Sequence, residues 1–498
     1  MGQTIYLDTG AEASVAEYHN YGIEEYDKNP YIQALPKLIS NREIIESLYQ
    51  KPQYKEDECL LDSAIRLHLV QRMYSLFQPL PTHIKVWNMV ATLIRQGYLA
   101  RNPFNKEYVR FLHESGKAII NMQSNTVNQF LFKTTASTGV LIGFSGMGKT
   151  TTVNRILSHI PQIILHNQYK ETEFTQVQLT WLKLEAPHNA SLKALCLQFF
   201  MKLDQLLGTN NFKQYVSRNL STDSMLPLMG QASQNVGLGL LVIDELQHLV
   251  GRHMNQTMSY FVTLINSFGV PVLFIGTPAA YPIFQSELRM ARRITGMGEI
   301  VWNNMENDDE FKLLLERLWE YQWLRHKSEL TEEMVDTFYE ETQGITDLIV
   351  KLFINVQEEA ILSGKEVITV ALVRKVANQC FGALKQMLEA IKSKNPYKIV
   401  KYEDIRRLEV KNEVVDTTVR IVEREKNSII ETETKGEYAN KIKKTQSIRQ
   451  VKKDKKTYDK DDLRFILKSS NKNVKEAHQV LIENNYIDDM GEWVQNND

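Results

Sequence analysis

Residues 143 to 150 read Gly143-Phe144-Ser145-Gly146-Met147-Gly148-Lys149-Thr150. This octapeptide matches, without a gap, the G-x-x-x-x-G-K-T pattern of loops that hold nucleotide phosphates. Glycines let backbone N–H groups close around phosphate oxygens. Lys149 adds a mobile positive charge for the β- and γ-phosphates, and the Thr150 hydroxyl is placed to ligate Mg²⁺. The alternative interpretation is a chance match in a glycine-containing turn.

The flanking residues supply the context that this motif needs. Residues 138–142 predict a short buried strand, and residues 151–159 predict a helix. The positive end of that helix would face the phosphates. We therefore predict a strand–loop–helix unit that binds ATP through residues 143–150 and Thr151.

A second apolar run ends in two acids. Residues 240–243 (LLVI) predict a buried parallel strand, and Asp244 and Glu245 follow it directly. An acid at such a strand end holds Mg²⁺, directly or through water, and the next acid can polarise the attacking water as a general base. The alternative is that both acids cap a helix that starts near Leu246. With a P-loop present, the acid pair favours ATP hydrolysis.

A third strand is predicted over residues 269–275, and polar groups follow it. Thr277 at its end could bond the γ-phosphate or the lytic water, or it could only cap a turn before Pro278. Arg289, Arg292 and Arg293 come next. Arg292 and Arg293 are candidates for a finger that stabilises charge on the γ-phosphate of a neighbouring subunit. A solvated basic helix face is the alternative.

In this order the motifs resemble an AAA+ ATPase, with a helical lid expected near residues 308–392. The lid stretch 344–351 (GITDLIVK) lacks the arginine often found there, and Lys351 is the available substitute. The resemblance extends to TnsC, the AAA+ regulator family of Tns-type transposons. It rests on six stretches besides the P-loop: 27–36 (DKNPYIQALP), 97–103 (GYLARNP), 238–249 (LGLLVIDELQHL), 269–278 (GVPVLFIGTP), 288–293 (LRMARR) and 343–353 (QGITDLIVKLF).

The resemblance implies a function and a set of partners. ATP and Mg²⁺ would join copies of the chain into a ring or short filament on duplex DNA. That assembly would connect a target selector of the TnsD/TniQ type to the transposase subunits TnsA and TnsB. Hydrolysis through Glu245 would dismantle it. In TnsC-like rings the stretch after the P-loop tracks DNA, which makes Lys193, Lys202, Lys213 and Arg218 candidate contacts; a solvated helix face is the alternative for each.

Composition is compatible with this interpretation. With 43% hydrophobic and 24% charged residues the chain is an ordinary globular protein. Its formal net charge of −1 gives no global attraction to nucleic acid, so DNA binding would depend on local patches. Three widely spaced cysteines predict neither a zinc site nor a disulfide framework. No apolar run is long enough to span a bilayer, so we expect a cytoplasmic protein without a membrane partner.

The predicted fold class is α/β, with a parallel-sheet P-loop AAA+ core between helical regions. We expect four parts: an N-terminal arm and helical partner-binding region (1–130), the nucleotide-binding core (131–305), the helical lid (306–395) and a charged C-terminal extension (396–498). The core would include an alternating strand at 177–184 and a helix through residue 207. The extension holds eight Lys/Arg and one Asp at 441–456, either a solvated linker or a phosphate-binding run, and a small helical unit at 461–485.

Two other function classes share some of these motifs. An AAA+ helicase loader or replication initiator would bind ATP and DNA but deposit a helicase. A pure scaffold would bind ATP without hydrolysing it, which the presence of Lys149, Asp244 and Glu245 argues against. No spacing of acids identifies a nuclease site.

Overall fold

The structure is a computed structural model, and it describes residues 3–120, 134–216, 220–250, 257, 259–263, 265, 269–285, 298–393 and 402. The chain divides into two compact units, Met1–Lys411 and Asn412–Asp498. All described residues belong to the first unit. The basic run at 441–456 and the helical unit expected at 461–485 lie outside them.

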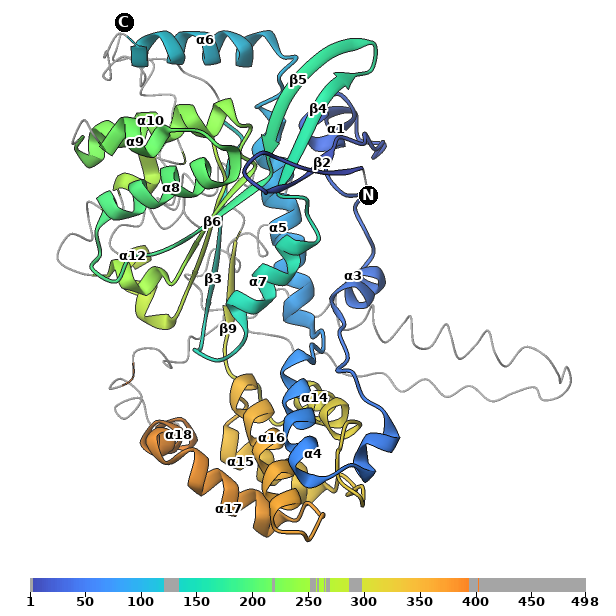
Figure 1. Ribbon diagram of the computed structural model, residues 1–498. Helices are drawn as coiled ribbons and strands as arrows, with labels where there is room; N and C mark the ends of the chain where they lie inside the picture. Colours follow the sequence, from blue (N-terminus) through green and yellow to red (C-terminus); the bar gives the residue numbers. More distant parts are fainter. Residues whose placement is uncertain are drawn as a thin grey trace, which may run out of the picture. The chain divides into compact units, whose positions relative to one another are not determined.

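A five-stranded parallel sheet forms the centre of the first unit (Figure 1). The strand order is β6-β7-β8-β3-β9. The strand before the P-loop, β3, therefore lies between β8 and β9. The strands are β3 (Thr138–Gly143), β6 (Trp181–Glu185), β7 (Leu240–Asp244), β8 (Val272–Gly276) and β9 (Glu299–Trp302). The parallel α/β core predicted from the motifs is confirmed.

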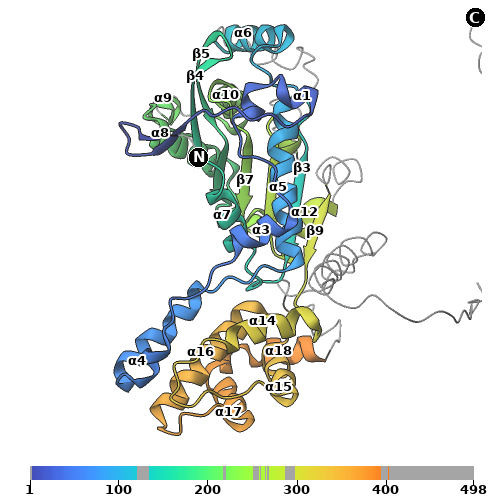
Figure 2. The ribbon, with the colours of Figure 1, turned by 90° about the vertical axis from the view of Figure 1, so that its right-hand side faces the viewer.

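Alternating side chains on these strands separate two hydrophobic clusters. Leu141, Val242 and Leu273 pack with α5 (Pro81–Leu99) and α7 (Lys149–Ser158) on one face. Val140, Ile243 and Phe274 pack with α8 (Leu192–Leu207) and α10 (Thr222–Asn235) on the other. The two layers of helices are visible on opposite sides of the strands (Figures 1 and 2). Every residue of the three inner strands β3, β7 and β8 is buried, as expected for a sheet covered on both sides.

The alternating run at 177–184 was predicted as one strand, and the structure divides it between two sheets. A single residue separates the end of β5 (Thr172–Leu179) from the start of β6. The residue between them, Thr180, turns away to bond the carbonyl of Pro161 at 2.5 Å. β5 pairs with β4 (Ile163–Tyr169) in a separate four-stranded sheet of order β1-β2-β4-β5. Alternation alone cannot reveal such a break, because both halves keep the same period.

The N-terminal arm completes the smaller sheet. β1 (Thr4–Tyr6) pairs antiparallel with β2 (Glu12–Val15), and β2 runs parallel to β4, with Ala13 opposite Ile163. The Ala13 side chain is buried in the hydrophobic cluster that also holds Val140, Ile243 and Phe274 of the central sheet. The arm is therefore anchored on the hairpin that follows the P-loop helix.

The remaining helices precede and follow the central sheet. Before it lie α1 (Glu24–Asp27), α2 (Pro30–Gln33), α3 (Asn41–Leu48), α4 (Ser63–Val70) and α6 (Lys106–Ile120). Along the sequence, α9 (Asn211–Val216) and α12 (Tyr281–Gln285) lie between strands of this sheet. The lid holds α14 (Asp309–Trp319), α15 (Glu332–Thr342), α16 (Thr346–Leu362), α17 (Val370–Cys380) and α18 (Lys385–Lys392). No helix among the described residues is both long and apolar enough to cross a membrane.

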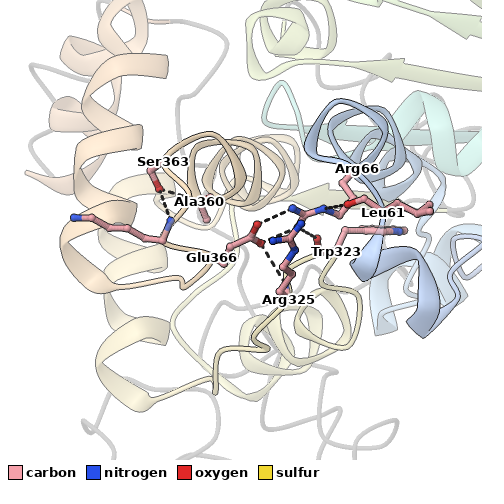
Figure 3. A network of polar contacts seen from close by, with 8 residues as sticks. Leu61, Arg66, Trp323, Arg325, Ala360, Ser363 and Glu366 are labelled. Carbon is pink, nitrogen blue, oxygen red and sulfur yellow. Dashed lines mark hydrogen bonds and ion pairs between the residues drawn. The ribbon is translucent and has the colours of Figure 1, made fainter.

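The helix α4 packs on the lid rather than on the central sheet, and a buried ion pair joins the two (Figure 3). The Arg66 guanidinium binds both carboxylate oxygens of Glu366, at 2.7 and 2.6 Å, and it also donates to the carbonyls of Leu61 and Trp323. The backbone N–H of Arg325 donates to the same carboxylate. Arg66 is 1% exposed, and each of its three side-chain nitrogens has an acceptor inside the protein, where an unpaired charge would be costly.

This ion pair predicts a measurable stability effect. Arg66→Met should lower the free energy of unfolding by about 3 to 5 kcal/mol, because it leaves the Glu366 carboxylate buried without its partner. The double variant Arg66→Met/Glu366→Gln should recover much of that loss, because no buried charge then remains. Urea titration followed by tryptophan fluorescence measures both values.

The same pair sets a pH dependence. Hydrogen bonding to Arg66 lowers the pKa of Glu366. The ion pair should therefore contribute its full share to the free energy of unfolding above the ordinary pKa of a glutamate. That contribution should disappear as the pH falls through the lower pKa that Glu366 has in the folded protein. Equal stability of the single and double variants at neutral pH would contradict this account.

Candidate nucleotide-binding site

The P-loop lies where the central strand β3 meets the helix α7. Gly146 and Gly148 adopt positive φ values of 81° and 86°, which other residues rarely reach, so the loop needs glycine at both positions. The Lys149 ammonium is buried and donates to the carbonyls of Gly143 and Phe144, both at 2.7 Å. The loop thus forms at the N-terminus of α7, where backbone N–H groups and the helix dipole favour an anion.

The acidic strand end meets the P-loop directly. The Thr150 hydroxyl donates to Oδ2 of Asp244 at 2.9 Å, and the backbone N–H of Glu245 donates to Oδ1 of the same carboxylate at 2.9 Å. Asp244 is 2% exposed. Thr150 and Asp244, the predicted magnesium ligands, are 94 positions apart in the sequence, and the fold brings their side chains into contact.

The distance between these two oxygens suits a magnesium ion. Neighbouring ligands in an octahedron with Mg–O bonds of about 2.1 Å lie about 3.0 Å apart. One hydroxyl and one carboxylate oxygen are the ligand types that Mg²⁺ prefers, with phosphate oxygens and water completing the shell. The residues present fit this ion.

Glu245 has an unusual backbone, with φ 55° in the left-handed region. This conformation turns the chain sharply after β7, and a short 3-10 helix, η4 (Leu246–Leu249), begins at Leu246, where the alternative interpretation expected a helix. A non-glycine residue held at positive φ stores strain of about 1 to 3 kcal/mol, a cost concentrated at functional sites. The backbone thus sets Glu245 apart from an ordinary helix cap.

Gln247 links Glu245 to the end of the neighbouring strand β8. Its side-chain carbonyl accepts from the backbone N–H of Thr277 at 3.1 Å, and its amide nitrogen donates to Oε2 of Glu245. Gly276 permits this contact, because a Cβ there would lie 3.2 Å from the Gln247 oxygen. The structure thus brings Glu245 and Thr277 together through a residue to which the sequence had assigned no role.

The lid contacts the P-loop through the N-terminus of α16. The backbone N–H of Asp347 donates to the carbonyl of Gly146 at 2.9 Å. Lys351, considered as the substitute for a lid arginine, lies one turn further along and pairs with the Asp347 carboxylate at 2.7 Å. Both side chains are about half exposed, so this pair remains accessible to solvent.

Lys183 is a site residue that sequence reasoning missed. It lies on β6, and its ammonium is 2.8 Å from Oδ2 of Asp244 and 2.8 Å from the side-chain carbonyl of Asn154 on α7. The sequence offered one signal, a lysine between two leucines in a predicted strand. That signal could not be used because the pairing of β6 with β7 was unknown.

The other predicted site residues are distributed more widely. Lys193 is half-buried on α8, and Lys213 is exposed on α9. Lys202 is half-buried; burial lowers its pKa, and its ammonium donates to the Lys183 carbonyl at 2.8 Å. Arg218, Arg292 and Arg293 lie outside the described residues.

Comparison with known proteins agrees with the P-loop core. Residues 133–284 match a family described as AAA domain. No curated protein matches the chain. Among solved structures, the chain is similar to the Orc1 protein of Aeropyrum pernix in complex with DNA, at 15% identity over 63% of this chain and 82% of that one, with a TM-score of 0.34.

Two further solved structures are similar at the same level. One is Cdc6p from Pyrobaculum aerophilum, at 16% identity over 63% of this chain and 86% of that one, with a TM-score of 0.33. The other is the RuvB Holliday junction branch migration motor of Thermotoga maritima, at 14% identity over 56% and 70%, with a TM-score of 0.29. The family match and the strand–loop–helix geometry together identify the segment from residue 133 to residue 284 as an AAA domain.

Proposed function

We propose that this protein binds and hydrolyses ATP with Mg²⁺ at the P-loop. The contact of the Thr150 hydroxyl with the Asp244 carboxylate is the observation that carries the proposal, because it joins the phosphate loop to the acidic strand end. When bound there, Mg²⁺ supplies charge neutralisation to the β- and γ-phosphates. When ATP binds, the Lys149 ammonium would exchange the carbonyls of Gly143 and Phe144 for phosphate oxygens. Its buried position would then place the positive charge directly against the phosphates.

The base in this mechanism is Glu245. Its carboxylate would polarise the attacking water, as expected for an acid that follows the magnesium ligand. Gln247 holds one oxygen of that carboxylate and the backbone of Thr277, so it fixes the distance between the base and the polar end of β8. Arg292 or Arg293 of a neighbouring copy would stabilise the charge of the transition state.

We further propose that the ATPase regulates DNA transposition, on the basis of the TnsC-like stretches. ATP would join copies of the chain around target duplex DNA, with contacts from Lys213 and its neighbours to phosphates. The assembly would connect a TnsD/TniQ-type target selector to TnsA and TnsB, and hydrolysis would end it. The stretches that carry this resemblance extend beyond the AAA domain, into residues 27–36 and 343–353.

Lys149→Ala should abolish ATP binding and, with it, ATP-dependent assembly on DNA. The reason is the loss of the only lysine that the P-loop places against the phosphates. Fluorescent-nucleotide titration and electrophoretic mobility shift with duplex DNA measure the two effects. Lys375→Ala, an exposed lysine paired with Glu359 on the lid, serves as the matched control and should behave as wild type. Normal ATP-dependent assembly by Lys149→Ala would refute the proposed coupling.

Glu245→Gln should bind ATP normally but hydrolyse it about 10² to 10⁴ times more slowly, because the amide cannot accept the proton of water. Its DNA complexes should consequently outlast those of the wild type. Phosphate release and filter-binding decay measure the two rates. If the Glu245→Gln complexes disassemble at the wild-type rate although hydrolysis is blocked, then ATP hydrolysis is not what ends the assembly.

Partner capture distinguishes transposition from replication. With ATP and duplex DNA, the full chain should retain TnsA and TnsB of its own transposon and should not retain a replicative helicase. The AAA+ loader or initiator class predicts the reverse pattern. If the chain retains only the helicase, the proposal of transposition partners is wrong, whereas the proposal of an ATPase site is unaffected.

A further inference from the structure

The strand β6 delivers a lysine to the magnesium side of the nucleotide site. Leu182 and Leu184 point to the α8 face of the sheet, where both are buried. Lys183, between them, therefore points to the opposite face, toward α7. There its ammonium meets Asn154 on α7 and Asp244 on β7.

The position of Lys183 is fixed from several directions. β6 runs parallel to β7 with Lys183 opposite Val242 and Glu185 opposite Asp244. On its backbone, the carbonyl of Lys183 accepts from the Lys202 ammonium at 2.8 Å. The Lys183 side chain is only 14% exposed. The ion pair with Asp244 is consequently a built feature of the core rather than a surface contact, whose strength solvent would screen.

Lys183 and a magnesium ion would share one oxygen. Lys183 and Thr150 both donate to Oδ2 of Asp244, and Thr150 with that oxygen forms the edge that fits Mg²⁺. A buried carboxylate without a counter-ion is strongly destabilising. With Lys183 beside it, Asp244 is already neutralised, and an incoming divalent cation meets a positive charge within a few ångströms.

We propose that Lys183 is an internal counter-ion of Asp244 that keeps the magnesium site from loading until a nucleotide supplies negative charge. The four charges of the triphosphate offset the repulsion between the ammonium and the metal, so metal and nucleotide enter together. Lys183 is a positioning residue in this scheme, since it acts through Asp244. The inference rests on the proposed nucleotide site, but it concerns a state without nucleotide.

The test is a Mn²⁺ titration of the full chain without nucleotide, followed by electron paramagnetic resonance. Mn²⁺ replaces Mg²⁺ as the probe because it prefers the same oxygen ligands. Lys183→Gln keeps a hydrogen-bond donor but removes the charge, and it should bind Mn²⁺ about tenfold or more tightly than wild type. Lys183→Arg keeps the charge and should match wild type. Adding Asp244→Asn to Lys183→Gln should remove the gained binding.

Each outcome decides the matter. Equal Mn²⁺ affinity of wild type and Lys183→Gln would overturn the proposal, and so would a gain that persists with Asp244→Asn. If Lys183→Gln proves unfolded, the proposal requires Mg²⁺ to restore its folding, because a metal that binds only the folded state stabilises that state; failure of that rescue would also overturn it. Because no nucleotide is present, a failure here is separate from a failure of ATP binding, which Lys149→Ala tests.

Discussion

The site depends on the burial of one carboxylate. Asp244 ends the strand β7 inside the protein, where an ionised group is stable only if donors surround it. Three donors do so: the Thr150 hydroxyl, the Glu245 backbone and the Lys183 ammonium. Thr150 lies on α7, Lys183 lies on β6 and Glu245 is the residue directly after β7, so the Asp244 side chain holds the P-loop helix and two strands in one arrangement. The position of the candidate nucleotide site follows from the need to satisfy this charge.

Much of the central fold could be predicted from local patterns. Three of the five strands and the P-loop helix appear within a few residues of their expected bounds, because buried parallel strands are short apolar runs that end at polar residues. The four-stranded sheet was not predicted. Its pairing joins residues near position 13 to residues near position 163, and no local pattern indicates such a partner. The break at Thr180 was missed because the residues before and after it keep the same alternation.

The candidate site, like the fold, could be predicted from the sequence only in part. Asp244, Thr150 and Thr277 could be named as candidates from the sequence because each stands at the end of an apolar strand or inside the phosphate loop. Lys183 and Gln247 could not, because their roles depend on which strands are neighbours and on the backbone turn at Glu245. A side chain that acts through another residue leaves no spacing rule in the sequence. Only the positions of its hydrogen-bond partners identify it.

The pairing of Arg66 with Glu366 also has a consequence for how the protein is made. The two residues are 300 positions apart. At ribosomal speeds of about 5 to 20 residues per second, the arginine waits roughly 15 to 60 s for its carboxylate to be synthesised. During that interval the P-loop and the central strands β3 to β9 are synthesised, while the segment around α4 still lacks Glu366. An early helix of this chain thus gains its buried ionic partner only after the nucleotide-binding core has been synthesised.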